Sequence, residues 1–195
     1  MAAAYNPCSF AVSNQGMRTK QTIAIIGATG NMGSAIAKSL SVGNYRLLLY
    51  ARDFNTCKQL AEEILAIHLL ADAEAMDCSI NASWEADMII IAAPDSEYKE
   101  ISLRIREFAT QKIIISMVNP LYETYTGMLT APETSDAEDL QQLLPNSKVV
   151  KTVMDSKRAE LVIAGNDQDA VEMVRDLMNT AGYQTIIAEN LFIQL

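Results

Sequence analysis

Short apolar segments alternate along this chain with stretches in which apolar residues recur at helical spacing. The apolar segments are rich in isoleucine, leucine and valine, which is typical of strands that are buried on both faces of a sheet. The alternation predicts an α/β protein of the Rossmann type, in which helices cover both faces of a doubly wound, mostly parallel sheet. The strands are expected at 22–26, 45–50, 75–78, 88–93, 112–118, 149–150, 161–164 and 185–188.

The helical stretches between these strands are each expected to bury one face. Small polar residues precede several of them, as is usual at helix N-termini. The predicted caps are Asp53 for the second helix, Ser135 for a helix that ends before Pro145, and Asn166 or Asp167 for the last helix, which Gly182 closes. The residues expected to face the core are Met32, Ala35, Ile36 and Leu40, then Leu60, Ala61, Ile64 and Leu65, then Tyr98, Ile101, Leu103, Ile105 and Phe108 in a helix at 95–108, and finally Val171, Val174, Leu177 and Met178.

The size and composition of the chain suit one domain with a substantial core, since half of its 195 residues are apolar and 20% are charged. Residues 21–195 are predicted to form that single Rossmann domain, and residues 1–20 an N-terminal tail without function. The tail has neither the basic start nor the continuous apolar run of a signal peptide. No apolar run approaches the about 20 residues that span a bilayer, so no membrane association is predicted.

Charge and residue usage exclude several function classes. A formal net charge of −9 argues against general binding to nucleic acid, which requires a basic face. The three cysteines lie far apart, which predicts reduced thiols in the cytoplasm and argues against a zinc site or a disulfide scaffold. His68 is the only histidine and is expected to be half-buried at a helix end. Histidine-dependent catalysis is therefore not expected, and no metal site is predicted.

The segment after the first predicted strand carries Gly27, Gly30 and Gly33 within seven residues. A tight turn from a buried strand into a helix aims backbone N–H groups and the positive end of the helix dipole at one point, where a pyrophosphate can bind. The dinucleotide pattern G-x-G-x-x-G is matched at its second and third glycines, while Ala28 stands at the first. A tight turn that binds nothing is the alternative. The predicted nucleotide-binding residues here are Gly27, Ala28, Thr29, Gly30, Asn31, Met32 and Gly33.

The residues at the end of the second predicted strand indicate whether such a site binds NAD or NADP. NAD sites place a carboxylate there for the ribose 2′-hydroxyl, whereas NADP sites supply cations for the 2′-phosphate. Here the strand is followed by Ala51 and Arg52, and Lys58 lies near the start of the next helix. We therefore expect NADP(H) rather than NAD(H), bound by these three residues. The alternative is that Arg52 and Lys58 are solvated surface charges.

With these residues in place, the chain resembles the NADP oxidoreductases that use the deazaflavin coenzyme F420. It is also similar to the cytosolic NADPH domains of six-transmembrane ferric reductases. The glycine turn alone is shared by many nucleotide-binding folds, but the ordered set of matching segments is more specific. These segments are 26–33, 51–52, 91–94, 116–121, 135–151 and 164–167 with the final helix, so the resemblance covers roughly residues 22–195.

The resemblance implies hydride transfer between NADPH and a flavin- or deazaflavin-like co-substrate. Two departures concern the acceptor side of the site. Residues 152–155 replace an Ala-Phe-Asn-like sequence of the relatives, and the short link 156–160 replaces a longer segment. The identity of the acceptor is therefore not carried over from the family. The nucleotide contacts that the resemblance implies come from the glycine turn, Arg52, Ala93, Pro94, Asn119 and Pro120.

Three functions are compatible with the residues. The leading hypothesis is an NADP(H)-dependent oxidoreductase acting on a small-molecule redox acceptor, because hydride transfer between stacked rings needs positioning rather than a histidine. The second is a nucleotide-binding redox sensor or regulatory protein without turnover, which the shortened acceptor region favours. The third is an atypical short-chain dehydrogenase or NmrA-like protein, although the Tyr-x-x-x-Lys pair of that class is missing.

The connection 121–134 is long for a link between a strand and a helix, and it contains Tyr122 and Tyr125. Connections of this length are often functional, so we expect a lid whose aromatic rings cover the nicotinamide or its acceptor. The alternative is that the segment crosses the surface, or that the two tyrosines pack into a homodimer interface.

Overall fold

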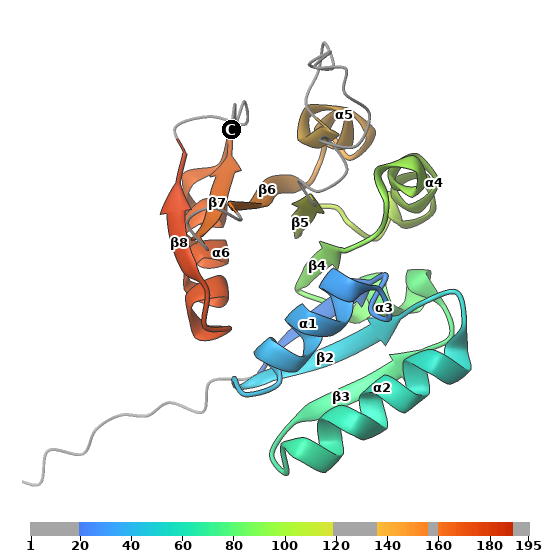
Figure 1. Ribbon diagram of the computed structural model, residues 1–195. Helices are drawn as coiled ribbons and strands as arrows, with labels where there is room; N and C mark the ends of the chain where they lie inside the picture. Colours follow the sequence, from blue (N-terminus) through green and yellow to red (C-terminus); the bar gives the residue numbers. More distant parts are fainter. Residues whose placement is uncertain (1–19, 119–135, 156–159, 189–195) are drawn as a thin grey trace, which may run out of the picture.

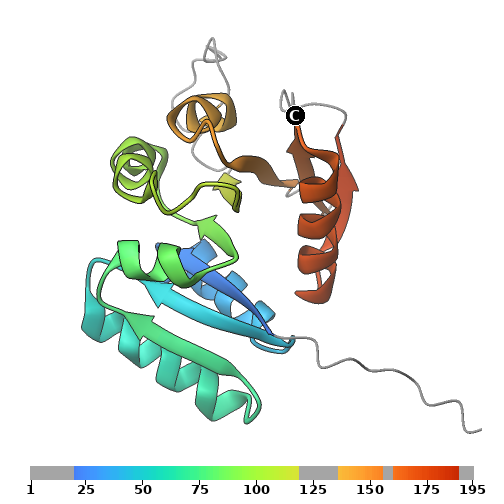
Figure 2. The same ribbon diagram turned by 180° about the vertical axis from the view of Figure 1, so that it is seen from behind.

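The computed structural model describes residues 20–118, 136–155 and 160–188, in which eight strands form one sheet between two layers of helices (Figure 1 and Figure 2). The strand order is β3-β2-β1-β4-β5-β6-β7-β8, which confirms the predicted Rossmann-type α/β architecture. The elements are β1 (Gln21–Ile26), α1 (Asn31–Leu40), β2 (Tyr45–Tyr50), α2 (Phe54–Ile67), β3 (Asp72–Met76), α3 (Ser79–Glu85), β4 (Met88–Ile91), α4 (Asp95–Ile105), β5 (Ile113–Val118), α5 (Asp136–Leu143), β6 (Lys148–Asp155), β7 (Glu160–Gly165), α6 (Gln168–Thr180) and β8 (Gln184–Ile187).

The described strands pair in parallel except at β6 and β7, where Asp155 faces Glu160 in an antiparallel pair. An antiparallel neighbour can follow after a short turn, whereas a parallel one needs a crossover of a dozen or more residues. The short link that departs from the family pattern therefore fits this reversal. The prediction of a strand at only 149–150 was too short, because residues 151–153 pair with both β5 and β7.

Alternate residues of the central strands point to opposite helix layers. Ile23 and Ile25 of β1 belong to the apolar cluster that contains the buried faces of α1, α2 and α6. Ala24 and Ile26 belong to a second cluster, with α3, α4 and α5. Because the sheet is covered on both sides, its strands are continuously apolar, as the sequence pattern indicated.

The predicted inward faces of α1, α2 and α4 are mostly buried, but each includes one residue that is exposed. Ala35 of α1 is exposed while Ala37 is buried. Leu65 of α2 is 42% exposed, and Leu103 of α4 is 54% exposed while its neighbour Ser102 is buried. Each of these exposed residues lies next to a buried one, about 100° away around the helix. The prediction placed these three residues on the buried face because it relied on their apolar character alone.

The predicted helix ends are largely confirmed. The Asp53 carboxylate accepts a hydrogen bond from the Asn55 backbone N–H at the start of α2, and Asp167 rather than Asn166 caps α6 through the Ala170 N–H. His68 is half-buried at the C-terminal end of α2. Gly182 follows α6 with φ +89°, a conformation that favours glycine. The predicted cap Ser135 lies outside the described residues, although α5 does end before Pro145.

Candidate functional site

The chain turns to opposite sides of the sheet after β1 and after β4, which are neighbouring parallel strands. From β1 it enters α1, which packs on one face, and from β4 it enters α4, which packs on the other face. Diverging connections of this kind open a crevice at the carboxyl ends of the two strands, where open α/β sheets bind their ligands.

The turn between β1 and α1 depends on two of its glycines for packing. Gly27 has φ +85°, and a Cβ at that residue would lie 2.5 Å from the carbonyl oxygen of Ala92, at the end of β4. A Cβ at Gly33 would overlap the carbonyl oxygen of Gly27. These two residues let the turn, α1 and β4 approach one another closely, so they are needed by the fold itself.

Gly30 differs from the other two glycines because a Cβ there would be in tight contact with its neighbours but would not overlap them, and because the residue lines the crevice. Its φ of −68° suits any residue, and a Cβ there would lie 3.3 Å from the Gly27 carbonyl oxygen. It is the N-cap of α1, and it supplies no side-chain hydrogen bond to the first turn. The backbone N–H groups at the start of α1 are therefore available to an anionic ligand.

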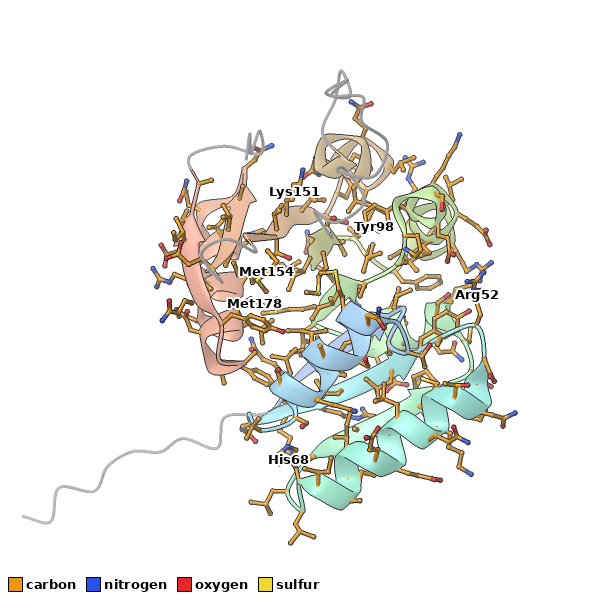
Figure 3. All side chains as sticks on the ribbon, in the orientation of Figure 1. Arg52, His68, Tyr98, Lys151, Met154 and Met178 are labelled. Atoms are coloured by element: carbon orange, nitrogen blue, oxygen red, sulfur yellow. The ribbon has the colours of Figure 1, made fainter. Side chains whose placement is uncertain are left out.

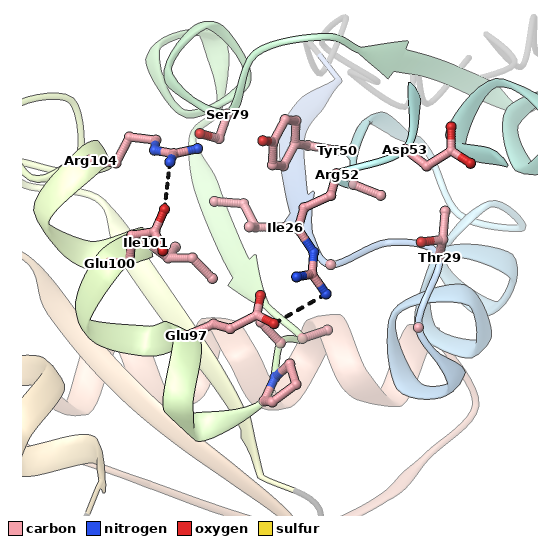
Figure 4. Close-up of a pocket in the computed structure, with 16 residues that line it drawn as sticks. Ile26, Thr29, Tyr50, Arg52, Asp53, Ser79, Glu97, Glu100, Ile101 and Arg104 are labelled. Atoms are coloured by element: carbon pink, nitrogen blue, oxygen red, sulfur yellow. Dashed lines mark hydrogen bonds and ion pairs between the residues drawn. The ribbon is translucent and has the colours of Figure 1, made fainter. Parts of the chain in front are cut away.

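A cavity of about 500 Å³ occupies the crevice (Figure 4). The Tyr50 carbonyl oxygen accepts hydrogen bonds from the N–H groups of Gly27 and Ala28, and this holds the end of β2 beside the glycine turn. The predicted site residues that line the cavity are Gly27, Thr29, Gly30, Ala51, Arg52, Ala93 and Pro94.

Other predicted site residues lie elsewhere. Ala28 is fully buried, Asn31 is exposed, and Met32 packs on the apolar core. Lys58 was predicted to face the nucleotide, but it does not line the cavity: its ammonium lies on the exposed side of α2, 3.9 Å from the Glu62 carboxylate. Asn119 and Pro120, and the predicted lid at 121–134 with Tyr122 and Tyr125, lie outside the described residues.

Part of the cavity wall was missed by sequence reasoning. Glu97, Ile101 and Arg104 line it from one face of α4, and Glu100 lies beside them. Their spacing places them on one face of a helix. This pattern would have predicted them as cavity residues only if the start of α4 at the switch point had been known. Tyr50 at the end of β2 and Ser79 at the start of α3 also line the cavity, and no sequence pattern indicated them.

Two ion pairs connect charged groups of the cavity wall. Arg52 Nη2 lies 3.3 Å from Glu97 Oε1, and Arg104 Nη2 lies 2.6 Å from Glu100 Oε1 (Figure 4). The Arg52 side chain is 85% exposed and projects over the cavity, so a ligand can reach it. The fifth charged group, Asp53, is bound to its own helix, because its carboxylate accepts hydrogen bonds from the Thr56 hydroxyl and the Asn55 N–H. These hydrogen bonds lower the pKa of the carboxyl.

The Ser79 hydroxyl is buried in the cavity wall, and among the described residues it has no hydrogen-bond partner. A buried hydroxyl without a partner is unfavourable, and ligands commonly satisfy such groups. Ser79 is therefore the one orphaned polar side chain that the described structure places at this cavity.

Polar groups further along the sheet are tied to the backbone. The Tyr98 hydroxyl lies 3.1 Å from the Met117 carbonyl oxygen and accepts a hydrogen bond from Ser116 (Figure 3). Thr152 donates to the Ser116 carbonyl oxygen.

Burial raises the pKa of the Cys57 thiol to about 11, and its sulfur donates to the Leu49 carbonyl oxygen. This thiol is therefore not a nucleophile at neutral pH.

The model of one protein family, NADP oxidoreductase coenzyme F420-dependent, matches residues 22–120, just over half of the chain. The chain belongs to this family. The matched range contains the glycine turn, Arg52 and the whole of the cavity wall. The resemblance noted from the sequence is thus confirmed, as are the oxidoreductase class and the NADP-binding Rossmann type.

Individual relatives agree with the family assignment. The F420-dependent NADP reductase of Methanocaldococcus jannaschii is 27% identical over 175 residues, which cover 80% of this chain and 78% of that protein. A structure of a candidate F420-dependent NADP-reductase from Arthrobacter sp. FB24 aligns with a TM-score of 0.67 and 23% identity, over 86% of this chain and 84% of that one.

A pyrroline-5-carboxylate reductase from Coxiella burnetii has the same fold, with a TM-score of 0.66 and 16% identity, over 89% of this chain and 60% of that one. Within the parts of the chain that the structure describes, none of the helices has the length and apolar character needed to cross a membrane.

Proposed function

We propose that this chain binds NADP(H) in the cavity between β1 and β4 and exchanges hydride between it and a flavin- or deazaflavin-like small-molecule acceptor. The observation that carries the proposal is the cavity itself, at the switch point of the sheet and beside an uncapped helix N-terminus. The relatives named F420-dependent NADP reductases support both the nucleotide and the class of acceptor.

The residues of the cavity fit a dinucleotide. Gly30 lines the cavity without a side chain, so a pyrophosphate can approach the N–H groups of α1, and Thr29 adds a hydroxyl beside it. Arg52 supplies a guanidinium for the 2′-phosphate, and Ala93 and Pro94 form a wall without charge. Ser79 lies in the wall of the same cavity, and a rotation of its side chain would offer its unpaired hydroxyl to a bound nucleotide.

NADPH, when bound, supplies a hydride, and the chain's own task is to hold and orient the two reactants. That task needs no proton shuttle, which agrees with a single histidine at the end of α2. Homodimer formation, a cytoplasmic location and the single-domain organisation of residues 21–195 stay predictions.

An assay of NADPH oxidation tests the proposal, with FMN, FAD and a deazaflavin as acceptors and the absorbance of NADPH as the readout. We expect turnover with at least one of these acceptors in the wild type and none in Gly30→Val. A wild-type protein that binds neither NADP⁺ nor NADPH would overturn the proposal.

A redox sensor without turnover is the second candidate. It is favoured by the direct reversal from β6 into β7, which replaces the longer segment at the acceptor side of the relatives. Tight NADPH binding without oxidation by any acceptor of the panel would support this candidate. The family match favours both candidates over a short-chain dehydrogenase.

A further inference from the structure

The charged groups of the cavity wall do not favour an anion as strongly as Arg52 alone would suggest. Two arginines, Arg52 and Arg104, face three carboxylates, Asp53, Glu97 and Glu100. Asp53 is engaged with the first turn of α2, and Glu100 is paired with Arg104. The carboxylate that meets Arg52 is therefore Glu97.

Glu97 reaches Arg52 from the opposite wall of the crevice. It belongs to the first turn of α4, whereas Arg52 follows β2, and the two side chains point toward each other across the cavity (Figure 4). Their 3.3 Å contact joins a well-exposed guanidinium to a carboxylate that is only 32% exposed. A carboxylate is thus present beside the end of β2 after all, although it comes from another part of the chain.

We propose that Glu97 is a specificity-determining residue that competes with the 2′-phosphate of NADP(H) for Arg52 and so reduces the preference for NADP(H) over NAD(H). This inference rests on the proposed function, because it assigns a role within the same nucleotide site. A nucleotide with a plain ribose leaves the ion pair intact, and its 2′-hydroxyl can donate to the carboxylate. A nucleotide with a 2′-phosphate must take Arg52 away from Glu97.

The competition follows from charge. A phosphate monoester carries a charge of about −1.5 to −2 at pH 7, so it attracts the guanidinium and repels the carboxylate beside it. Because the pair is open to solvent, the effect is modest: exposed pairs are typically worth up to about 1 kcal/mol, which corresponds to about fivefold in affinity.

Calorimetric titration of NADP⁺ and NAD⁺ into Glu97→Gln tests the inference. Removing the negative charge should strengthen NADP⁺ binding by about three- to fivefold. NAD⁺ binding should be nearly unchanged, because the amide oxygen of the new side chain can still accept from the 2′-hydroxyl. Glu62→Gln is the matched control, because Glu62 loses the same charge but pairs with Lys58 away from the cavity. The control should change neither affinity.

Arg52→Ala combined with Glu97→Gln separates competition from a general change in charge. If Glu97 acts mainly by competing for Arg52, the second substitution should raise the NADP⁺ preference clearly less once Arg52 is absent, because only the direct repulsion between the carboxylate and the phosphate is then relieved. A preference that rises equally in both backgrounds, or that does not rise in Glu97→Gln, would overturn the inference while leaving the proposed function intact. Failure of the wild type to bind either nucleotide would overturn both.

Discussion

Polar side chains in the two halves of this sheet are used in opposite ways. Around β1, β2 and β4 they face a cavity, as Arg52 and Glu97 do, or lie in its wall without a partner, as Ser79 does. Around β5 and β6, Ser116 and Thr152 are fully buried and bonded to the Tyr98 hydroxyl or to main-chain carbonyls.

The difference shows where the described chain is prepared for a ligand. Groups that are already satisfied within the protein gain little from a ligand, whereas an uncapped helix start and an orphaned hydroxyl gain a hydrogen bond. The first half of the sheet thus has hydrogen-bonding groups that a ligand can pair with. In the described part of the second half, the buried polar groups named here are already paired and stabilise the fold.

The glycines of the β1–α1 turn give the largest expected effect. Gly30→Val should leave a folded protein and weaken NADP⁺ binding by more than about a hundredfold, because the branched side chain blocks several charge-assisted hydrogen bonds worth about 1.5–3 kcal/mol each. Circular dichroism and calorimetric titration measure the two properties. Unchanged affinity in a folded variant would show that the turn serves the fold alone.

Gly33→Ala is the companion variant, since its new Cβ would overlap the Gly27 carbonyl oxygen. Here we expect a loss of folding stability of about 1–3 kcal/mol, typical of overpacking, whether or not nucleotide is present. The two substitutions should therefore separate the ligand-facing and fold-supporting glycines.

Arg52→Ala should weaken NADP⁺ binding by about tenfold, at the lower end for a charge-assisted contact because the side chain is well exposed. NAD⁺ binding should change little. Lys58→Ala removes an equal charge from the exposed side of α2 and should leave both affinities unaltered. Equal losses in the two variants would mean that only the overall charge matters.

Ser79→Ala and Ser83→Ala compare two buried hydroxyls that lack partners, of which only Ser79 lines the cavity. Both should stabilise the unliganded protein by up to about 1 kcal/mol, since each removes an unsatisfied group. Only Ser79→Ala should also weaken nucleotide binding, by a few-fold. Thermal unfolding with and without NADP⁺ distinguishes the two, and an identical ligand-induced shift would exclude a role for Ser79.

The smallest effect is expected at the Asp53 cap. Because the folded state lowers the pKa of this carboxyl, its contribution to stability is present above the ordinary Asp pKa and is lost as the pH falls through the lowered value. Asp53→Ala should reduce Tm at neutral pH, and the difference from wild type should shrink under acidic conditions. A difference that stays constant with pH would contradict this origin of the cap's stability.

The sequence predicted those parts of the site that are continuous along the chain. The glycine turn and Arg52 each follow directly from the end of a strand, so their positions depend only on the strand being recognised, whereas Ala93 and Pro94 were predicted from the family resemblance. The parallel sheet and the faces it buries were equally accessible, because the apolar segments are continuous and the caps Asp53 and Asp167 are local signals.

The cavity lining differs from the predicted site where a position depends on how a helix is rotated or where it crosses the sheet. Lys58 is close to Arg52 in the sequence, but α2 carries it to the exposed side. Glu97 and Arg104 reach the cavity only because α4 packs on the opposite face of the sheet from α1. No local pattern contains that information.

The uncapped start of α1 also links the stability of the fold to its surroundings. Asp53 and Asp167 accept hydrogen bonds from the first backbone N–H groups of α2 and α6, but no side chain does so at the start of α1. A ligand that pairs with these N–H groups of α1 binds only the folded chain. By mass action, a ligand present at about a hundred times its Kd would add about 2.7 kcal/mol to the free energy of unfolding. The lifetime of this protein in a cell would then follow the size of the nucleotide pool, and it would be longest when that pool is full.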